Sequence, residues 1–255
     1  MMEIKVLGCS GGIGGESRTT CLLVNDDILI DAGTGICDLM PTALTKIDHI
    51  FLTHSHVDHI LGIPLIADAV FGLRNSPITI YALEETISHL KQHIFNWNIW
   101  PDFTVLPSTE MPIINFQAIT IGQCINLSDR KITVLPANHV VAAVGFALDS
   151  GLSSLAFSGD TVSCPEFWSS VNQLPNLTHL IVETTFSNAD EPLALISKHY
   201  CPRLLAKYIK QLEGNPMVHI THLNPSEEDH IMQELRTSID GLRLRRLCRD
   251  EIIHI

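Results

Sequence analysis

The chain alternates short apolar runs with amphipathic stretches, and this pattern predicts alternating β-strands and α-helices. Apolar runs, several with every second residue apolar, predict strands over residues 3–7, 19–24, 27–30, 47–52, 77–82, 112–121, 130–135, 141–148, 153–157, 179–182, 216–221 and 251–255. Helical spacing predicts helices over residues 60–74, 83–95 and 165–171, and a final helix capped by residues 226–229. Because the two kinds of element alternate to the end, we expect an α/β fold.

Length and composition are compatible with one sizeable hydrophobic core, since the chain has 255 residues and 45% of them are hydrophobic. Length alone would also allow two small domains. The sequence contains no internal repeat, low-complexity segment or linker, so we expect residues 1–255 to form a single domain. It has no apolar stretch of about 18 residues that could span a membrane, and its first residues lack the apolar core of a secretion signal.

Charge and cysteine content bear on partners and location. The net charge of −12 repels polyanions at long range, and the only basic cluster is Arg243, Arg245 and Arg246. The seven cysteines form no Cys-x-x-Cys pair, and their number is odd. They therefore predict buried thiols in a reducing compartment rather than disulfides, and a cytoplasmic location follows. We expect neither a membrane nor a nucleic-acid partner.

The segment of residues 53–59, Thr-His-Ser-His-Val-Asp-His, is the strongest chemical signal in the chain. It places His54, His56, Asp58 and His59 directly after the apolar run 47–52. Neutral imidazole and carboxylate are the ligand types that suit Zn²⁺ and related divalent ions. So many of them in one turn would crowd one another unless something binds there, so the segment predicts a metal site.

Further polar residues follow other predicted strands, and Asp31 and Asp160 among them have an alternative explanation as turn residues. The full set is Asp31, His139, Asp160, Glu183 and His222. Residues 8–15 include five glycines, which either form a wide turn or line a site by close backbone approach. A histidine pair, His89 and His93, lacks a third ligand, and His219 alternates away from the strand face that leads to His222. We expect these three histidines to be structural or solvent-facing.

The motif His-x-His-x-Asp-His after an apolar strand resembles that of the metallo-β-lactamase fold hydrolases, and the later motifs extend the resemblance over nearly the whole chain. It implies a four-layer αβ/βα sandwich with two divalent ions at one edge, Zn²⁺ or alternatively Mn²⁺ or Fe²⁺. By the same resemblance, Asp31 orients a ligand histidine. One ion would be held by His54, His56 and His139, the other by Asp58, His59 and His222, with Asp160 bridging both.

Three segments resemble a subgroup of that family, the class II cyclic-nucleotide phosphodiesterases: residues 60–62, residues 95–103 and the block 183–208. The resemblance implies hydrolysis of a 3′,5′-cyclic nucleotide, cyclic AMP or cyclic GMP, to the 5′-monophosphate. Asp58 would orient the attacking water, and His199 would act as general acid with Glu183 as its partner. The subgroup usually has glycine before this histidine, where this chain has Lys198. Residues 96–103 form either a loop anchored by aromatic packing or a lid that stacks on a nucleobase.

Other functions fit the same motifs. A ribonuclease Z-like endonuclease shares the glycine loop and most ligands, but the interval between His139 and Asp160 has no room for its long RNA-gripping arm. The net charge of −12 also argues against RNA. A glyoxalase II-like thioester hydrolase has no specific support, and a non-catalytic nucleotide sensor on the same fold remains an alternative. We expect a small-molecule cyclic-nucleotide substrate and, by analogy, a homodimer.

Overall fold

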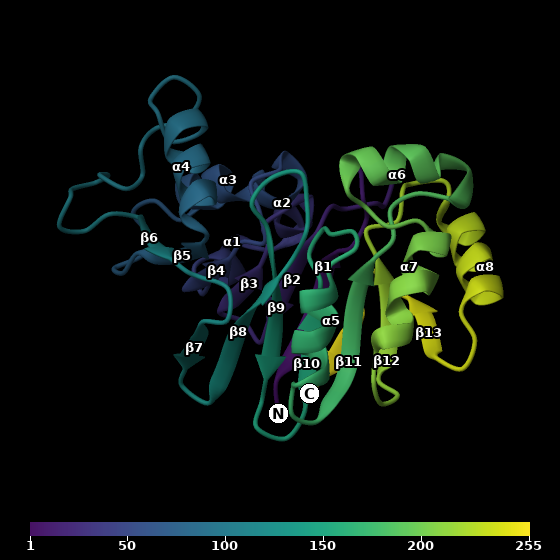
Figure 1. Ribbon diagram of the computed structural model, residues 1–255. Helices are drawn as coiled ribbons and strands as arrows, with labels where there is room; N and C mark the ends of the chain where they lie inside the picture. The colour runs from purple at the N-terminus through teal and green to yellow at the C-terminus, as the bar shows by residue number, and fades with distance from the viewer.

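Two β-sheets of seven strands each face one another in the computed structural model, which describes residues 1–255 (Figure 1). The first sheet has the strand order β14-β1-β2-β3-β4-β5-β6, and the second has the order β13-β12-β11-β10-β9-β8-β7. The first sheet consists of β1 (Glu3–Gly8), β2 (Cys21–Val24), β3 (Ile28–Ile30), β4 (His49–Phe51), β5 (Ile78–Ala82), β6 (Ile114–Ala118) and β14 (Ile252–His254). The second consists of β7 (Cys124–Leu127), β8 (Arg130–Pro136), β9 (Val144–Asp149), β10 (Ser154–Phe157), β11 (Leu177–Glu183), β12 (Met217–Thr221) and β13 (Arg243–Arg246).

Helices cover the outer face of each sheet (Figure 1). The helices are α1 (Pro41–Leu44), α2 (Val57–Ile60), α3 (Gly62–Ala69), α4 (Glu84–His93), α5 (Pro165–Asn172), α6 (Glu191–Ser197), α7 (Pro202–Tyr208) and α8 (Glu228–Ser238). Three short 3₁₀ turns span Thr34–Asp38, Asn188–Asp190 and Ile209–Gln211. No helix combines the length and the apolar character needed to cross a bilayer.

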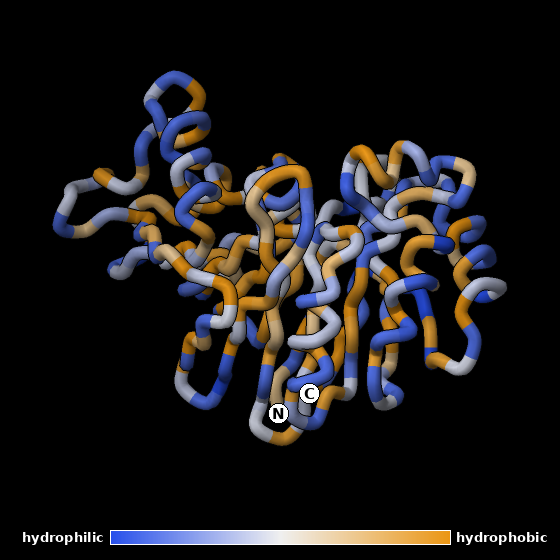
Figure 2. The backbone as a smooth tube through the Cα atoms, viewed as in Figure 1, coloured by the Kyte–Doolittle hydropathy of each residue, from blue (hydrophilic) through white to orange (hydrophobic).

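Three separate hydrophobic cores account for the layering. Apolar side chains from the inner faces of both sheets, including Phe51, Phe146 and Phe157, fill the space between the sheets. A second core joins the first sheet to α3 and α4, and a third joins the second sheet to α5, α7 and α8. Figure 2 shows the corresponding apolar stretches along the interior strands. The four-layer αβ/βα sandwich implied by the sequence resemblance is therefore confirmed.

Parallel pairing decides where functional side chains can gather. Strands β3, β4, β5 and β6 run parallel to one another, as do β10, β11, β12 and β13. The carboxyl ends of the strands within each group therefore lie at one edge of the sheet. Both edges lie on the same side of the sandwich, and the loops that leave them carry the predicted chemistry.

Several predicted elements differ in extent. Two helices, α2 and α3, take the place of the one helix expected over residues 60–74. The first of them, α2, begins at Val57, so that Asp58 and His59 lie in its first turn. Residues 226–229 do not cap the last helix with a side chain; Ser226 has a positive φ of 73°, and α8 begins at Glu228. The strand over residues 112–121 is limited to β6. Strands β7 and β13 were not predicted. β7 is a run of only four residues, Cys-Ile-Asn-Leu, and β13 is mostly basic and exposed.

The cysteines are only partly as expected. All seven are free thiols, but Cys37, Cys124 and Cys248 are exposed and Cys9 is half-buried. Only Cys21, Cys164 and Cys201 are buried. The prediction of uniformly buried thiols was therefore wrong, because several cysteines lie in surface turns and edge strands that carry no apolar pattern.

Candidate metal centre

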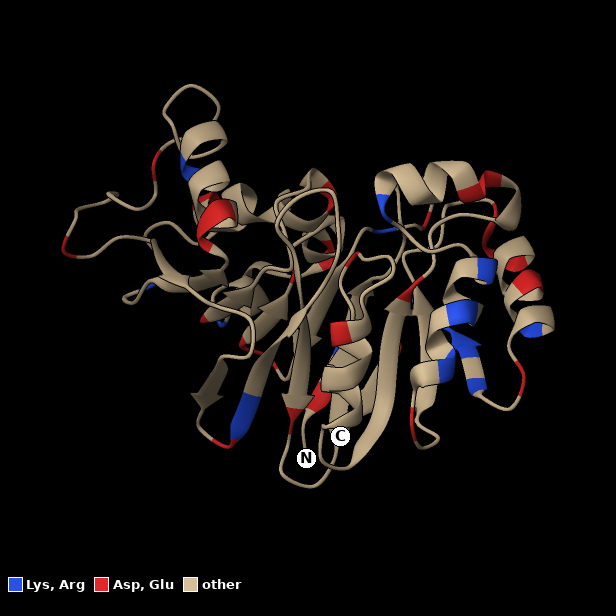
Figure 3. Cartoon of the chain, in the orientation of Figure 1, with Lys and Arg blue, Asp and Glu red and all other residues tan.

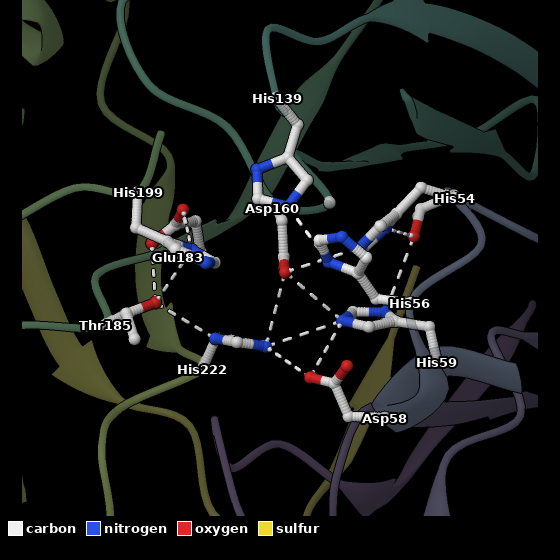
Figure 4. A network of polar contacts seen from close by, with 12 residues as sticks. His54, His56, Asp58, His59, His139, Asp160, Glu183, Thr185, His199 and His222 are labelled. Atoms are coloured by element: carbon white, nitrogen blue, oxygen red, sulfur yellow. Dashed lines mark hydrogen bonds and ion pairs between the residues drawn. The ribbon is translucent and has the colours of Figure 1, made fainter. Parts of the chain in front are cut away.

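Seven side chains from four separate chain segments converge at the edge between the sheets (Figure 4). His54 and His56 follow β4, and Asp58 and His59 lie on α2, which comes next in the chain. His139 follows β8, Asp160 follows β10 and His222 follows β12. Their ligand atoms form two groups, each with all atoms within 4.8 Å of one another: His54, His56, His139 and Asp160, and then Asp58, His59, Asp160 and His222. The grouping is the one that the sequence resemblance implied.

Asp160 occupies the middle of the cluster. Its Oδ2 lies 3.6 Å from Nε2 of His54, 3.3 Å from Nε2 of His59 and 3.4 Å from Nε2 of His222. Asp58 faces the second group, with Oδ2 3.5 Å from Nε2 of His59 and 3.3 Å from Nε2 of His222. A single carboxylate that belongs to both groups is the arrangement that two neighbouring cations require.

Hydrogen bonds on the outer side of the imidazoles fix which nitrogen faces inward. His59 donates from Nδ1 to Oδ2 of Asp31 at 2.7 Å, and Asp31 is fully buried. The Thr53 hydroxyl donates to the same carboxylate at 2.8 Å, so its oxygen is free to accept from Nδ1 of His54 at 3.0 Å. Because these protons point outward, Nε2 of both His54 and His59 faces the centre.

The second sheet orients its ligand candidates in the same way. The Thr185 hydroxyl donates to Oε2 of Glu183 at 3.1 Å. Its oxygen can therefore accept a hydrogen bond from Nδ1 of His222, which lies 3.0 Å away. His139 donates from Nδ1 to the backbone oxygen of Lys198 at 3.1 Å. His56 differs, since its Nδ1 is the atom that faces the cluster, 3.2 Å from Nε2 of His139.

The donor set fits a metal ion. Nε2 of His54 is buried and has no hydrogen-bond partner at all. A buried ring nitrogen with a lone pair and no donor costs free energy, and a cation at the centre would satisfy it. Imidazole nitrogens and carboxylates in two groups of four, with a shared bridging acid, are a donor set typical of Zn²⁺ and related divalent ions.

The groups around the centre shift the pKa values of its histidines in opposite directions. Burial lowers the pKa of His54 well below its ordinary value, and the neighbouring His59 adds to this effect. Burial would lower the pKa of His59 too, yet the charges of Asp160 and Asp31 raise it well above the ordinary value. The carboxylates thus draw a proton onto a ring that a metal would need deprotonated, so metal affinity should weaken as the pH falls.

His199 and Glu183 lie beside this cluster rather than in it. Nδ1 of His199 lies 2.9 Å from Oε1 of the fully buried Glu183, and its ring stacks on His222 with centroids 5.4 Å apart. Burial would lower the pKa of His199, but the charge of Glu183 and its hydrogen bond raise that pKa to about 9. Glu183 also accepts from the backbone N–H groups of Thr161 and Tyr200, which hold its carboxylate in place.

Three residues at the site, Thr53, Thr185 and Lys198, had no predicted role. Thr53 and Thr185 are the hydroxyl groups that orient the rings, and both were visible in the motifs only as neighbours of the charged residues. Lys198 adopts a left-handed backbone conformation, with φ 55°. Its ammonium donates to Oδ1 of Asn138 at 3.0 Å and to the backbone oxygen of His139 at 2.9 Å. Lys198 thereby ties α6 to the loop that carries His139.

The remaining predicted features lie around the centre. The glycine-rich loop passes close to His222, where a Cβ on Gly11 would lie only 2.6 Å from the His222 backbone oxygen. His89 contacts Ser55 at 3.0 Å through Nδ1, and it joins no metal-ligand group. In the aromatic segment Phe95 and Phe103 are buried in the first core, whereas 62% of Trp97 is exposed. The segment is anchored by packing, and the lid role stays a prediction.

Comparison with known families places the fold. The chain matches the beta-lactamase superfamily domain over residues 26–239. It therefore belongs to the beta-lactamase superfamily. Among solved structures this superfamily member is similar to unliganded yeast PDE1, with a TM-score of 0.83 over 100% of this chain and 99% of that one at 19% identity. It is also similar to the metallo-beta-lactamase fold protein YhfI from Bacillus subtilis, with a TM-score of 0.79 over 99% and 98% of the two chains at 19% identity.

Curated relatives of this superfamily member have two kinds of name. It is 27% identical to a probable 3′,5′-cyclic-nucleotide phosphodiesterase of Yersinia pestis, over 88% of this chain and 78% of that protein. It is 31% identical to a 3′,5′-cyclic-nucleotide phosphodiesterase of Schizosaccharomyces pombe, over 66% of this chain and 52% of that protein. A ribonuclease Z of Haloarcula marismortui is 32% identical over 58% of this chain and 47% of that protein. The chain thus spans about half the length of the latter two relatives.

Proposed function

We propose that this protein is a phosphodiesterase with two metal ions that hydrolyses 3′,5′-cyclic nucleotides to nucleoside 5′-monophosphates. The observation that carries the proposal is the complete set of seven inward-facing donors in two groups that share Asp160. A relative that aligns with 88% of this chain is named a probable cyclic-nucleotide phosphodiesterase. The resemblance of residues 95–103 and 183–208 to the class II subgroup supports the same substrate class.

His54, His56 and His139 would hold one ion, Asp58, His59 and His222 the other, and Asp160 would bridge them. Zn²⁺ is the ion that this donor set favours, and Mn²⁺ and Fe²⁺ remain alternatives. Two ions bound there would supply water activation near neutral pH and charge neutralisation on the phosphoryl group. These assignments rest on donor geometry and on the motif resemblance.

Three side chains have proposed roles in the proton transfers. The 31% exposed carboxylate of Asp58 reaches the open side of the centre, where it would accept a hydrogen bond from the attacking water and orient it. As water attacks phosphorus, the bond from phosphorus to the 3′ oxygen breaks, and the departing oxygen needs a proton. His199 would supply that proton, because its pKa of about 9 keeps the ring protonated at neutral pH. Glu183 holds Nδ1 of His199, so that the Nε2 proton is the one available for transfer.

The test is incubation of zinc-loaded protein with cyclic AMP, cyclic GMP and a precursor tRNA, with products separated by chromatography. The proposal predicts the 5′-monophosphate and not the 3′-monophosphate from at least one cyclic nucleotide, with the tRNA left intact. Asp58→Ala should abolish turnover, whereas Asp68→Ala, on the exposed face of α3, should not. Nucleotide binding without turnover in the fully loaded protein would instead identify a sensor.

A ribonuclease Z-like activity is the second candidate, because a ribonuclease Z is among the relatives. Strands β9 and β10 occupy the interval between His139 and Asp160, so an RNA-gripping arm has no place there. The net charge of −12 also opposes the phosphate contacts that RNA binding needs. Trimming of the precursor tRNA in the same assay would favour this candidate. The single domain, cytoplasmic location and homodimer stay predictions.

A further inference from the structure

The inner face of the second sheet becomes polar at the end away from the metal centre. Along β12, Val218 and Ile220 pack into the outer core, so His219 between them faces the other sheet. His219 pairs in register with Arg245 of β13, and Met217 pairs with both His179 of β11 and Arg243 of β13. Positions that would ordinarily extend the apolar core between the sheets therefore carry two histidines and two arginines.

The hydrogen bonds in this cluster have one fixed direction. Arg245 donates from Nε to Nδ1 of His219 at 3.2 Å, and an arginine can only donate. The proton of His219 must then lie on Nε2, which faces Nδ1 of His179 at 2.9 Å. His179 accepts that bond, so its own proton lies on Nε2. The chain of hydrogen bonds ends on an N–H group of His179.

Burial keeps both rings neutral, as this direction requires. Burial lowers the pKa of His219 to about 3, and the positive charge of Arg245 adds to the effect. The pKa of His179 is lowered by burial and by Arg245 and Arg243. His219 is 1% exposed, so its position is set by the fold rather than by solvent.

Charge in the cluster is not balanced. Arg245 pairs with Glu251, and Glu251 also lies 3.8 Å from Nδ1 of His219. Arg243, in contrast, has no carboxylate within 4.0 Å of its guanidinium. Arg246 points to the opposite face, where it pairs with Glu228 of α8. The basic run on β13, visible in Figure 3, is thus split between a paired outer face and an inner face with excess positive charge.

These groups line one open cavity of about 350 Å³ between the sheets. Strand β14 of the first sheet closes it from the other side with Ile252, Ile253 and His254. The cavity therefore offers the His179 N–H and the Arg243 guanidinium beside a wall that includes Met217 and Ile253. Donors without a matching acceptor in a concave site are what an oxyanion needs.

We propose that this cavity binds a small phosphate-type oxyanion, either free phosphate or the phosphate group of a nucleotide. The site is independent of the proposed catalytic function, since none of its residues belongs to the metal centre. Arg243 would hold the anion by a charge-assisted pair, and His179 would donate to it from Nε2–H. The partly buried hydrogen bond from Arg245 to His219 would keep His179 oriented as a donor.

Histidine side-chain NMR on zinc-loaded protein tests the site, because it reports each ring separately. Inorganic phosphate is titrated at constant ionic strength against chloride. The ring resonances of His179 should shift saturably. Arg243→Gln should weaken this binding by about tenfold or more, because it removes the charge from the pair. Arg236→Gln, an exposed arginine on α8 outside the cavity, removes the same charge and should leave the dissociation constant unchanged.

Adenosine 5′-monophosphate and adenosine distinguish the source of the anion. If the nucleotide binds more tightly than phosphate while adenosine alone does not shift His179, the phosphate group of a nucleotide is the ligand. Equal affinity for nucleotide and phosphate points to free phosphate. The proposal is overturned if phosphate shifts only the rings of the metal centre, or if Arg243→Gln and Arg236→Gln bind phosphate equally well. Arg243 is exposed and forms no ion pair, so its substitution should leave the fold intact.

Discussion

Asp31 gives the sharpest test of how the candidate metal centre is built. Its carboxylate is fully buried and serves three donors: the Nδ1–H of His59 at 2.7 Å, the Thr53 backbone N–H at 2.8 Å and the Thr53 hydroxyl at 2.8 Å. Asp31→Asn keeps the shape but replaces one acceptor oxygen by a donor. Whichever way the amide turns, either His59 or Thr53 then faces an N–H group instead of an oxygen.

The expected effect falls on metal affinity more than on folding. Removing the partner that orients a ligand histidine typically weakens metal binding by about 10- to 100-fold, or about 1.4–2.7 kcal/mol. Burial raises the pKa of Asp31 above its ordinary value despite its bonds to His59 and Thr53, so the charged form is itself costly at this position. A neutral isostere removes that cost, and the zinc-free protein should therefore lose little of its unfolding free energy.

Zinc affinity is measured by competition with a chromophoric chelator, and thermal unfolding of the zinc-free protein is followed in parallel. Asp48→Asn is the matched control, because Asp48 is half-exposed and pairs with Arg74 away from the centre. Unchanged zinc affinity in Asp31→Asn would refute the reasoning that Asp31 orients His59. If the zinc-free Asp31→Asn protein failed to fold, the main role of Asp31 would instead be to stabilise the fold.

Three further outcomes follow. Lys198→Gly relieves the left-handed backbone strain, about 1 kcal/mol, but removes two charge-assisted bonds to the His139 loop. The zinc-loaded protein should therefore unfold at a lower temperature, and a higher midpoint would contradict this. Trp97→Ala should leave the unfolding midpoint unchanged and raise KM for the cyclic nucleotide about fivefold or more if the ring stacks on the base; an unchanged KM would rule out the lid. The pKa of His199 is raised in the fold to about 9, so its contribution to stability, at most about 3 kcal/mol, is full below pH 6.5 and is lost as the pH rises through 9. In zinc-free protein the stability gap between wild type and His199→Gln should shrink over that range, and a gap independent of pH would contradict the assignment.

The candidate metal centre could be anticipated because its proposed ligands come in local motifs at the ends of apolar runs. His54, His56, Asp58 and His59 lie within six residues, and strand ends meet wherever parallel strands lie side by side. What holds the rings in place was not visible in the same way. Thr185 approaches His222 across 37 positions, and Lys198 approaches Asn138 across 60. Such contacts depend on how loops from different strands pack, and no local pattern encodes that packing.

The missed elements have a different cause. In β13 the sequence Arg-Leu-Arg-Arg has the alternation of a strand, but three charges in four residues hide it from a search for apolar runs. The strand forms because Leu244 packs against the third core and because β12 offers a free edge. His219 was correctly placed on a face away from His222. Its bonds to His179 and Arg245 could not be read from the sequence, because they need the register of three strands.

The proposed ligand set would link the stability of the two sheets. Each ion would take ligands from both halves: His54 and His56 of the first half with His139 of the second, and Asp58 and His59 of the first with His222 of the second. The rings are oriented from both sides too, by Asp31 from the first sheet and by Thr185 from the second. A ligand that binds only the assembled sandwich stabilises it in proportion to the logarithm of its free concentration. Zinc should therefore raise the unfolding midpoint of both sheets together, since neither half holds a complete group of donors without the other.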